Sequence, residues 1–158
     1  MKSQDQNLVE QKLVNLAKYL AELQPYLKIS SAQFENDPGR RRVVERLVQI
    51  IVECAIDTNN LVTQSLGLPP AANARESFQQ LHERQVLDAY VTQRYVGKYV
   101  GLRNVIVHLY EKVEPKTLYY SAKRLLKDSE EYGRQIRKFL SARARKNGAP
   151  RNNKPIGA

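Results

Sequence analysis

Four polar side chains interrupt an otherwise apolar segment in the second half of the chain. Arg103, Asn104, His108 and Tyr110 surround the aliphatic run 105–107. Burying hydrogen-bonding groups beside aliphatic side chains is costly unless each group meets a partner. Their concentration in one short segment therefore indicates either a structural network or a site for chemistry.

The spacing of these residues on a helix determines which of them can act together. At roughly 100° per residue, Asn104 and His108 lie one turn apart on one stripe, and we expect Asn104 to orient His108. Arg103 and His108 are about 140° apart around the axis, so they diverge on a straight helix. They could meet through the long arginine side chain, through an unwound helix end, or across a twofold axis from a second subunit.

An arginine and a histidine together suit the cleavage of RNA without a metal ion. The 2′-hydroxyl of a ribose attacks the adjacent phosphorus while a histidine removes its proton. A guanidinium holds the phosphate as negative charge builds on its oxygens. Because these two residue types supply both roles, neither a metal nor a cofactor is predicted. The structural alternative is that Arg103, Asn104 and His108 cap a helix end and pair within the core.

Other common catalytic patterns are missing from the sequence. It has no phosphate-binding glycine loop, no nucleophile elbow and no HExxH pair. The single cysteine, Cys54, cannot form an internal disulfide, and one cysteine with two histidines is too few for a structural zinc site. The other histidine, His82, lies in a charged segment and is expected at the surface.

The composition is that of one globular domain. Its 158 residues are 42% hydrophobic and 27% charged. No stretch approaches the roughly 20 apolar residues of a membrane-spanning helix, so no membrane association is predicted. The first ten residues lack the pattern of a secretory signal, and we therefore expect a cytoplasmic protein.

Positive charge is concentrated in the last third of the chain. The formal net charge is +10, and from residue 121 onward eleven Lys or Arg residues stand against three acidic ones. Such a field favours a polyanion as partner, and nucleic acid is the commonest polyanion in the cytoplasm. A solvated helix face followed by a solubilising tail is the alternative interpretation.

Apolar residues recur at helical spacing throughout, and no segment alternates with a period of two. The pattern predicts an all-α fold, a bundle of four or five helices in one domain over residues 1–146. Asp37 and Pro38 indicate the start of a long central helix, and Gly67 its end. Residues 147–158 offer little to bury and are expected to form a disordered basic tail. The expected helices cover residues 7–27, 38–66, 75–83, 88–110 and 117–140. Pro115 opens the last of them.

The segment that starts at Arg103 resembles the RX4HXY motif of the HEPN superfamily, and within it the motif of the HepT-like toxins. Arg103, His108 and Tyr110 occupy the three motif positions, and Asn104 follows the arginine as in the family pattern. The likeness extends over roughly residues 8–140. The likeness to the family's second helix lies in residues 34–38, 42–50 and 53–57. The likeness to the helix that leads into the motif lies in residues 95–110.

The resemblance implies an up-and-down helical fold and a homodimer that joins two motif segments in one cleft. It implies ribonuclease activity toxic to the host cell, with Arg103 holding the phosphate and His108 acting as acid or base. It also implies a partner, a small MNT-type nucleotidyltransferase antitoxin that neutralises the toxin by attaching AMP to Tyr110. A function of another class stays open, a non-catalytic helical dimer that binds a nucleotidyltransferase or RNA without cleaving it.

Two acidic residues of the expected central helix are further candidates for the site. Glu53 and Asp57 are one helical turn apart, so both are able to face the motif and orient Arg103. The alternative is that these carboxylates form ordinary ion pairs, either buried or at the surface.

Overall fold

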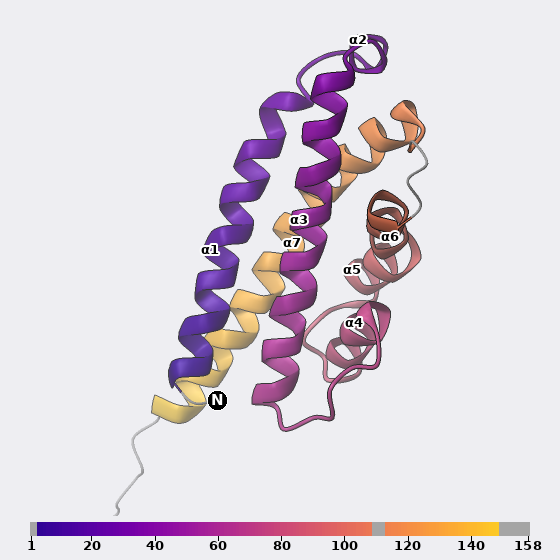
Figure 1. Ribbon diagram of the computed structural model, residues 1–158. Helices are drawn as coiled ribbons and strands as arrows, with labels where there is room; N and C mark the ends of the chain where they lie inside the picture. The colour runs from indigo at the N-terminus through magenta and orange to yellow at the C-terminus, as the bar shows by residue number, and fades with distance from the viewer. Residues whose placement is uncertain (1–2, 109–112, 149–158) are drawn as a thin grey trace, which may run out of the picture.

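A computed structural model describes residues 3–108 and 113–148, and within these ranges every regular element is a helix (Figure 1). This confirms the predicted all-α fold. Helices α5, η1 and α6 follow one another without a break, so the chain forms five longer helical segments and the short α2. The elements are α1 (Ser3–Tyr26), α2 (Ser31–Glu35), α3 (Pro38–Ser65), α4 (Ala74–Glu83), α5 (Ala89–Arg94), the π-helical η1 (Tyr95–Tyr99), α6 (Val100–His108) and α7 (Pro115–Gly148).

The central helix α3 begins and ends close to where its sequence signals predict. The Asp37 carboxylate accepts a hydrogen bond from the backbone N–H of Arg40 at 3.0 Å, and Pro38 occupies the first turn. The helix ends at Ser65, and Gly67 has a φ of +68°, a conformation that favours glycine. Local sequence therefore sets both ends of the helix that carries Glu53.

The short helix α2 joins α1 to α3 and is absent from the helices expected from periodicity. Its N-cap is Ser30, whose hydroxyl accepts from the Gln33 N–H at 3.1 Å while the Gln33 side chain accepts from the Ser30 N–H at 3.0 Å. Phe34 is fully buried and packs against Tyr119, with ring centroids 5.4 Å apart. Five residues are too few for a helical period to show, so only the capping pattern marks this element.

The helix expected over residues 88–110 is present through His108, but it contains a π-helical turn. Asp88 caps its start by accepting a hydrogen bond from the Val91 N–H at 2.8 Å. Between Tyr95 and Tyr99 the backbone bonds widen to the π pattern, which adds one residue relative to an α-helix. Each residue adds roughly 100° of rotation, so the π turn changes the faces that α6 presents.

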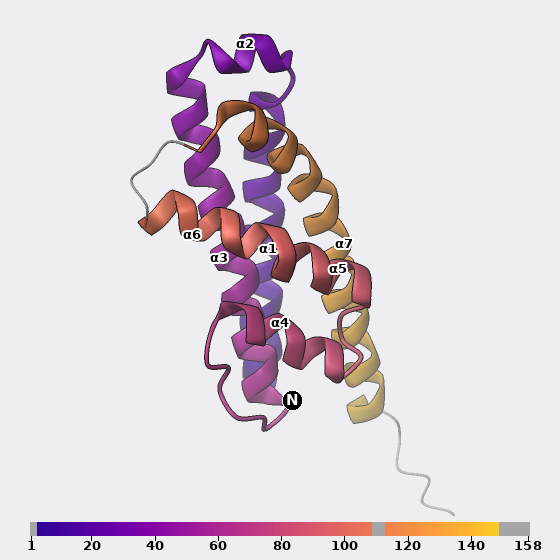
Figure 2. The ribbon, with the colours of Figure 1, turned by 90° about the vertical axis from the view of Figure 1, so that its right-hand side faces the viewer.

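Helices α1, α3 and α7 run along the length of the molecule, whereas the continuous α5–η1–α6 helix crosses them (Figure 2). Helix α1 packs against α3 and α7, α5 packs against α7, and α6 packs against α3. The resemblance implied an up-and-down bundle throughout. The structure differs, because the α5–η1–α6 helix crosses the bundle from α7 to α3. This crossing brings the motif segment onto the central helix.

The core contains a cluster of tyrosine rings whose hydroxyl groups all find partners. Phe78 stacks on Tyr95 with centroids 4.6 Å apart, and Tyr95 and Tyr132 lie at 5.5 Å. The Tyr132 hydroxyl donates to Oδ1 of Asn59 at 2.6 Å, and the Tyr95 hydroxyl lies 2.7 Å from the Ser129 hydroxyl. A buried polar group stabilises a fold only when it is hydrogen-bonded, and these contacts meet that condition.

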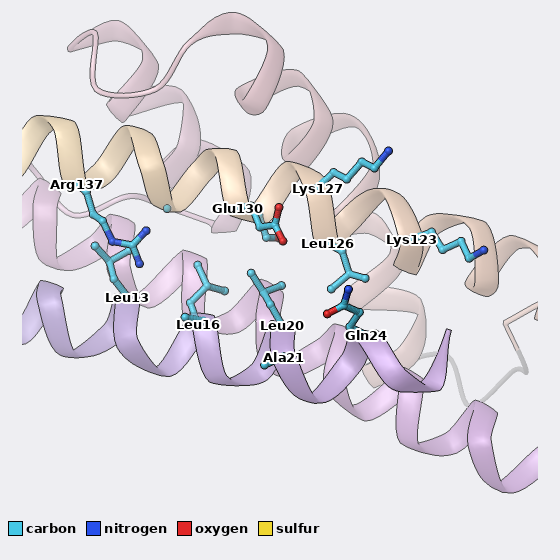
Figure 3. A pocket seen from close by; sticks show the side chains of 13 residues that line it. Leu13, Leu16, Leu20, Ala21, Gln24, Lys123, Leu126, Lys127, Glu130 and Arg137 are labelled. Atoms are coloured by element: carbon cyan, nitrogen blue, oxygen red, sulfur yellow. The ribbon is translucent and has the colours of Figure 1, made fainter. Parts of the chain in front are cut away.

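An open groove of about 560 Å³ separates parts of α1 and α7 (Figure 3). Apolar side chains such as Leu16, Leu20 and Leu126 line it, and Lys127 and Arg137 also border it. Both helices are thus amphipathic, with charged residues on their outer faces. Over the described residues, no helix is long and apolar enough to cross a membrane.

The last helix, α7, is the longest of the described elements at 34 residues. Leu118, Leu125, Ile136 and Leu140 on its inner face are buried. The helix reaches Gly148, so residues 147 and 148 continue α7 and do not belong to the predicted tail. The remainder of the predicted disordered tail lies outside the described residues.

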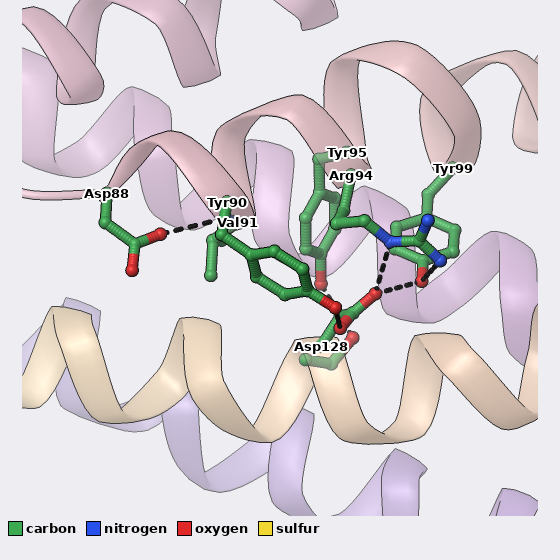
Figure 4. A network of polar contacts seen from close by, with 8 residues as sticks. Asp88, Tyr90, Val91, Arg94, Tyr95, Tyr99 and Asp128 are labelled. Atoms are coloured by element: carbon green, nitrogen blue, oxygen red, sulfur yellow. Dashed lines mark hydrogen bonds and ion pairs between the residues drawn. The ribbon is translucent and has the colours of Figure 1, made fainter.

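One buried carboxylate ties the crossing helix to α7 (Figure 4). Asp128, which is 5% exposed, accepts hydrogen bonds from Nε of Arg94 at 2.9 Å, from the Tyr90 hydroxyl at 3.0 Å and from the Tyr99 hydroxyl. Nη2 of Arg94 also donates to the Tyr99 hydroxyl at 3.2 Å. Burial, together with the Asp128 carboxylate, raises the pKa of Tyr99. The tyrosine therefore stays neutral and acts as a donor.

We expect Asp128→Asn to lower the free energy of unfolding by about 2–3 kcal/mol, because it removes the charge that pairs with Arg94 and replaces one acceptor oxygen with an NH2 group that faces other donors. Asp57→Asn is the matched control. It breaks the more exposed 3.3 Å ion pair with Lys12 and should cost under about 1 kcal/mol. Urea denaturation followed by circular dichroism measures both variants, and equal losses would contradict a special role for the buried carboxylate.

Candidate functional site

Arg103 lies on α6, and its guanidinium reaches across to α3. Its Nη2 and Nε atoms donate to Oε1 of Glu53 at 3.1 and 3.3 Å. Gln49, one turn earlier on α3, donates to the same oxygen through Nε2 at 3.1 Å. The side chains of Arg103 and Glu53 keep 24% and 35% of their surface exposed. The guanidinium is therefore fixed in orientation and still open to solvent.

Asn104 contacts Arg103 rather than His108. Its Oδ1 accepts a hydrogen bond from Nη1 of Arg103 at 3.1 Å. We expected Asn104 to orient His108 because the two residues share a helical stripe. The contact differs from this expectation because the guanidinium that reaches Glu53 also lies beside Asn104 and offers it a charged donor.

His108 is the last described residue of α6, and its side chain is exposed. Within the described ranges the His108 side chain makes no hydrogen bond to Arg103 or to another residue. The helix is regular from Val100 to His108, so the two side chains point in different directions instead of meeting at an unwound end. Tyr110, the third motif residue, lies outside the described residues.

Asp57 is directed toward α1, away from the motif. Its Oδ2 lies 3.3 Å from Nζ of Lys12, and 57% of its side chain is exposed. It was a candidate to orient Arg103 together with Glu53, but α6 crosses α3 and only one of the two turns of α3 meets the arginine. Lys12, Glu53, Cys54 and Asp57 border a small cavity of about 130 Å³. Burial raises the pKa of the Cys54 thiol, which keeps it protonated and unreactive.

Helix α6 has an apolar sequence that the described chain covers only in part. Val100 is its only buried residue, and Leu102, Val105, Ile106 and Val107 are all half-buried. Leu102, Val105 and Ile106 pack on the edge of the core, and their remaining surface faces outward. A partly uncovered apolar helix beside an exposed histidine has the character of an interaction surface.

Sequence reasoning missed Gln49, the third partner of the ion pair. The signal was present in the sequence, because a glutamine four residues before a glutamate on a helix readily donates to it. In the described part of the chain, no three His, Cys, Asp or Glu side chains gather in a way that could hold a metal ion. What the arrangement offers chemically is a positioned guanidinium and an exposed imidazole.

The fold and the site together are those of a small all-helical protein in which a crossing helix carries an arginine and a histidine. Comparison with known families shows to which family the chain belongs. The model of the family described as "Ribonuclease HepT-like" matches residues 16–136, most of the chain. The chain belongs to this HepT-like family, as its resemblance to the motif indicated.

Individual proteins are similar to this chain in sequence or in fold. A tRNA nuclease HepT from Aphanizomenon flos-aquae is 27% identical over 133 residues, covering 84% of this chain and 90% of the relative. Among solved structures, a tri-AMPylated HEPN toxin of Shewanella oneidensis in complex with MNT antitoxin has a TM-score of 0.76 at 22% identity, covering 87% of this chain and 99% of the toxin. The cytosolic protein YutE of Bacillus subtilis, of unknown function, has a TM-score of 0.75 at 16% identity, with coverages of 87% and 91%.

Proposed function

We propose that this protein is a metal-independent endoribonuclease and the toxin of a toxin–antitoxin pair, with Arg103 and His108 as its catalytic residues. The observation that carries the proposal is the guanidinium of Arg103, which Glu53 and Asn104 hold in place while 24% of the side chain stays exposed. Membership of the HepT-like ribonuclease family supports the reaction class. The name of the curated relative makes tRNA the first substrate to test.

The proposed reaction is an internal transfer at a ribose phosphate. His108 of one subunit accepts the proton of the 2′-hydroxyl as the 2′-oxygen forms a bond to phosphorus. The bond from phosphorus to the 5′-oxygen breaks, and that oxygen takes up the proton that His108 has accepted. The products are a 2′,3′-cyclic phosphate and a free 5′-hydroxyl. Arg103 stabilises the charge that develops on the phosphate oxygens during this exchange.

The hydrogen bonds of Arg103 leave it able to bind phosphate. Three of its N–H groups are engaged, one each from Nε, Nη1 and Nη2. A guanidinium carries five N–H donors, so two remain for a phosphate oxygen. Glu53 and Asn104 are the positioning residues of the site, because they fix the plane of the guanidinium before substrate arrives.

The divergence of Arg103 and His108 within one chain supports a site shared by two subunits. A homodimer formed around α6 would cover the exposed parts of Leu102, Val105, Ile106 and Val107. A twofold axis there would bring the arginine of one protomer toward the histidine of its partner. The cleft would then contain two copies of each catalytic group.

Purified protein should cut tRNA and mRNA in the presence of EDTA, and Arg103→Ala and His108→Ala should reduce the rate by at least about a hundredfold. Glu53→Gln should cause a smaller loss, since the arginine remains but is less well oriented. His82→Ala is the matched control, because His82 is an exposed histidine on α4, outside the motif. Intact RNA with wild-type protein would favour a non-catalytic interaction module instead.

A mixed dimer of one Arg103→Ala and one His108→Ala subunit tests the shared cleft. If the arginine and histidine of one site come from different protomers, one of the two sites is intact and about half of the wild-type activity returns. Co-expression of the two variants with different tags allows the mixed dimer to be isolated and assayed. A mixed dimer as inactive as its parents, or a monomeric wild type in sedimentation, would overturn the arrangement.

We further propose that an MNT-type nucleotidyltransferase neutralises the toxin by attaching AMP to Tyr110. The solved complex of a tri-AMPylated HEPN toxin with MNT antitoxin supports this form of regulation. Tyr110 follows His108 by two residues, so AMP there would place bulk and negative charge where the substrate phosphate binds.

Mass spectrometry after co-expression with the antitoxin should show AMP on the peptide that contains Tyr110. Tyr110→Phe should lose this modification and stay toxic, because the transferase no longer has its acceptor hydroxyl. Tyr120→Phe is the control, since Tyr120 is a tyrosine on α7 with 47% of its surface exposed. An unmodified Tyr110 in a neutralised complex would refute the proposal.

A further inference from the structure

We propose that Arg94, Lys98 and Arg124, together with the ring of Tyr90, form a second RNA-binding site that holds substrate phosphates and one base away from the scissile linkage. We call these four residues the anchor site. The inference rests on the proposed function, because it takes the substrate to be RNA. It adds a surface that lies outside the motif, on the opposite end of the crossing helix.

Arg94 is prepared for anion binding by its hydrogen bonds (Figure 4). Nε donates to Asp128 at 2.9 Å and Nη2 donates to the Tyr99 hydroxyl at 3.2 Å. Over the described residues, Nη1 has no hydrogen-bond partner, and 26% of the side chain is exposed. The guanidinium is thus immobilised on its inner edge with donors left on its outer edge, which lowers the entropy lost on binding a phosphate.

Lys98 and Arg124 add positive charge that the fold does not neutralise. Lys98 lies one turn after Arg94, and Arg124 lies one turn before Asp128 on α7. Neither residue forms an ion pair within the part of the chain that the structure describes. Partial burial and the positive charges of Arg124 and Arg94 lower the pKa of Lys98. Of the three cations, only Arg94 pairs with Asp128 over the described residues, and an incoming anion relieves the repulsion among them.

Tyr90 provides a flat surface beside these cations. Its ring is 57% exposed, and its hydroxyl is tethered to Oδ1 of Asp128 at 3.0 Å. An exposed aromatic ring held at one end is suited to stacking on an unpaired base, and cations next to it are suited to the flanking phosphates. This combination favours a single-stranded or loop segment of RNA over an acidic protein surface.

Three of the four anchor residues, Tyr90, Arg94 and Lys98, lie on the same continuous helix as Arg103 and His108. Arg94 and Arg103 are nine residues apart, which corresponds to about 14 Å along the axis. Arg94 contacts α7 while Arg103 contacts α3, so the two sites occupy different sides of the helix. A substrate several nucleotides long is needed to contact both, and the anchor site should therefore affect binding of long RNA more than the chemical step.

The test measures binding of tRNA to full-length protein in a His108→Ala background, so that the RNA stays intact. Lys98→Gln with Arg124→Gln should weaken the Kd about tenfold at low salt and reduce the slope of log K against log salt by about 1.5. Tyr90→Ala should weaken binding several-fold and Tyr90→Phe should not. The charge-matched control is Lys18→Gln with Lys28→Gln. Both lysines are exposed, Lys18 on α1 and Lys28 just after it.

Cleavage by the same variants with His108 restored separates this inference from the proposed function. The anchor variant should raise KM and leave kcat near the wild-type value. If wild type cleaves RNA and the anchor and control variants bind it equally, the anchor site is refuted while the ribonuclease proposal stands. If wild type binds RNA through the anchor site without cleaving it, the ribonuclease proposal is refuted while the anchor site stands. Loss of antitoxin binding in place of RNA binding would also refute the anchor site.

Discussion

The positions of Arg103 and His108 depend on the buried carboxylate of Asp128. A carboxylate removed from water must be paired and hydrogen-bonded, and over the described residues the donors to Asp128 come from the crossing helix, from Arg94, Tyr90 and Tyr99. Meeting this requirement fixes the rotation of α5 and η1 on α7. Because α6 continues the same helix, the rotation of Arg103 toward Glu53 is fixed with it.

The two arginine–carboxylate pairs of this helix differ in the exposure of their acids. Asp128 keeps only 6% of its side chain exposed, so its pair with Arg94 can serve structure, whereas Glu53 keeps 35%. In the more open pair a phosphate can approach Arg103 without unfolding the protein. Within the part of the chain that the structure describes, both arginines keep donors without a partner, so the same helix offers a proposed catalytic guanidinium at one end and a proposed anchoring guanidinium at the other.

Local signals in the sequence predicted much of this fold. The cap at Asp37, the proline after it and the glycine at position 67 act through their own backbone, so the limits of α3 could be read directly. The motif residues were found by their resemblance to a family pattern, and the contact of Arg103 with Glu53 was among the expected ones. The partners of Asn104 and Asp57 were not predictable, because they depend on how α6 crosses α3. A helical period carries no information about that angle.

The π turn between Tyr95 and Tyr99 makes the register of the helix a feature of the site. Deleting one residue there would restore an ordinary α-helix and turn everything beyond it by roughly 100°. Tyr90 and Arg94, which precede the π turn, would keep their contacts with Asp128. Arg103, which follows it, would point away from Glu53 on α3. Deletion of a single codon would thus remove the contact of Arg103 with Glu53 in a protein that keeps its fold and all of its motif residues.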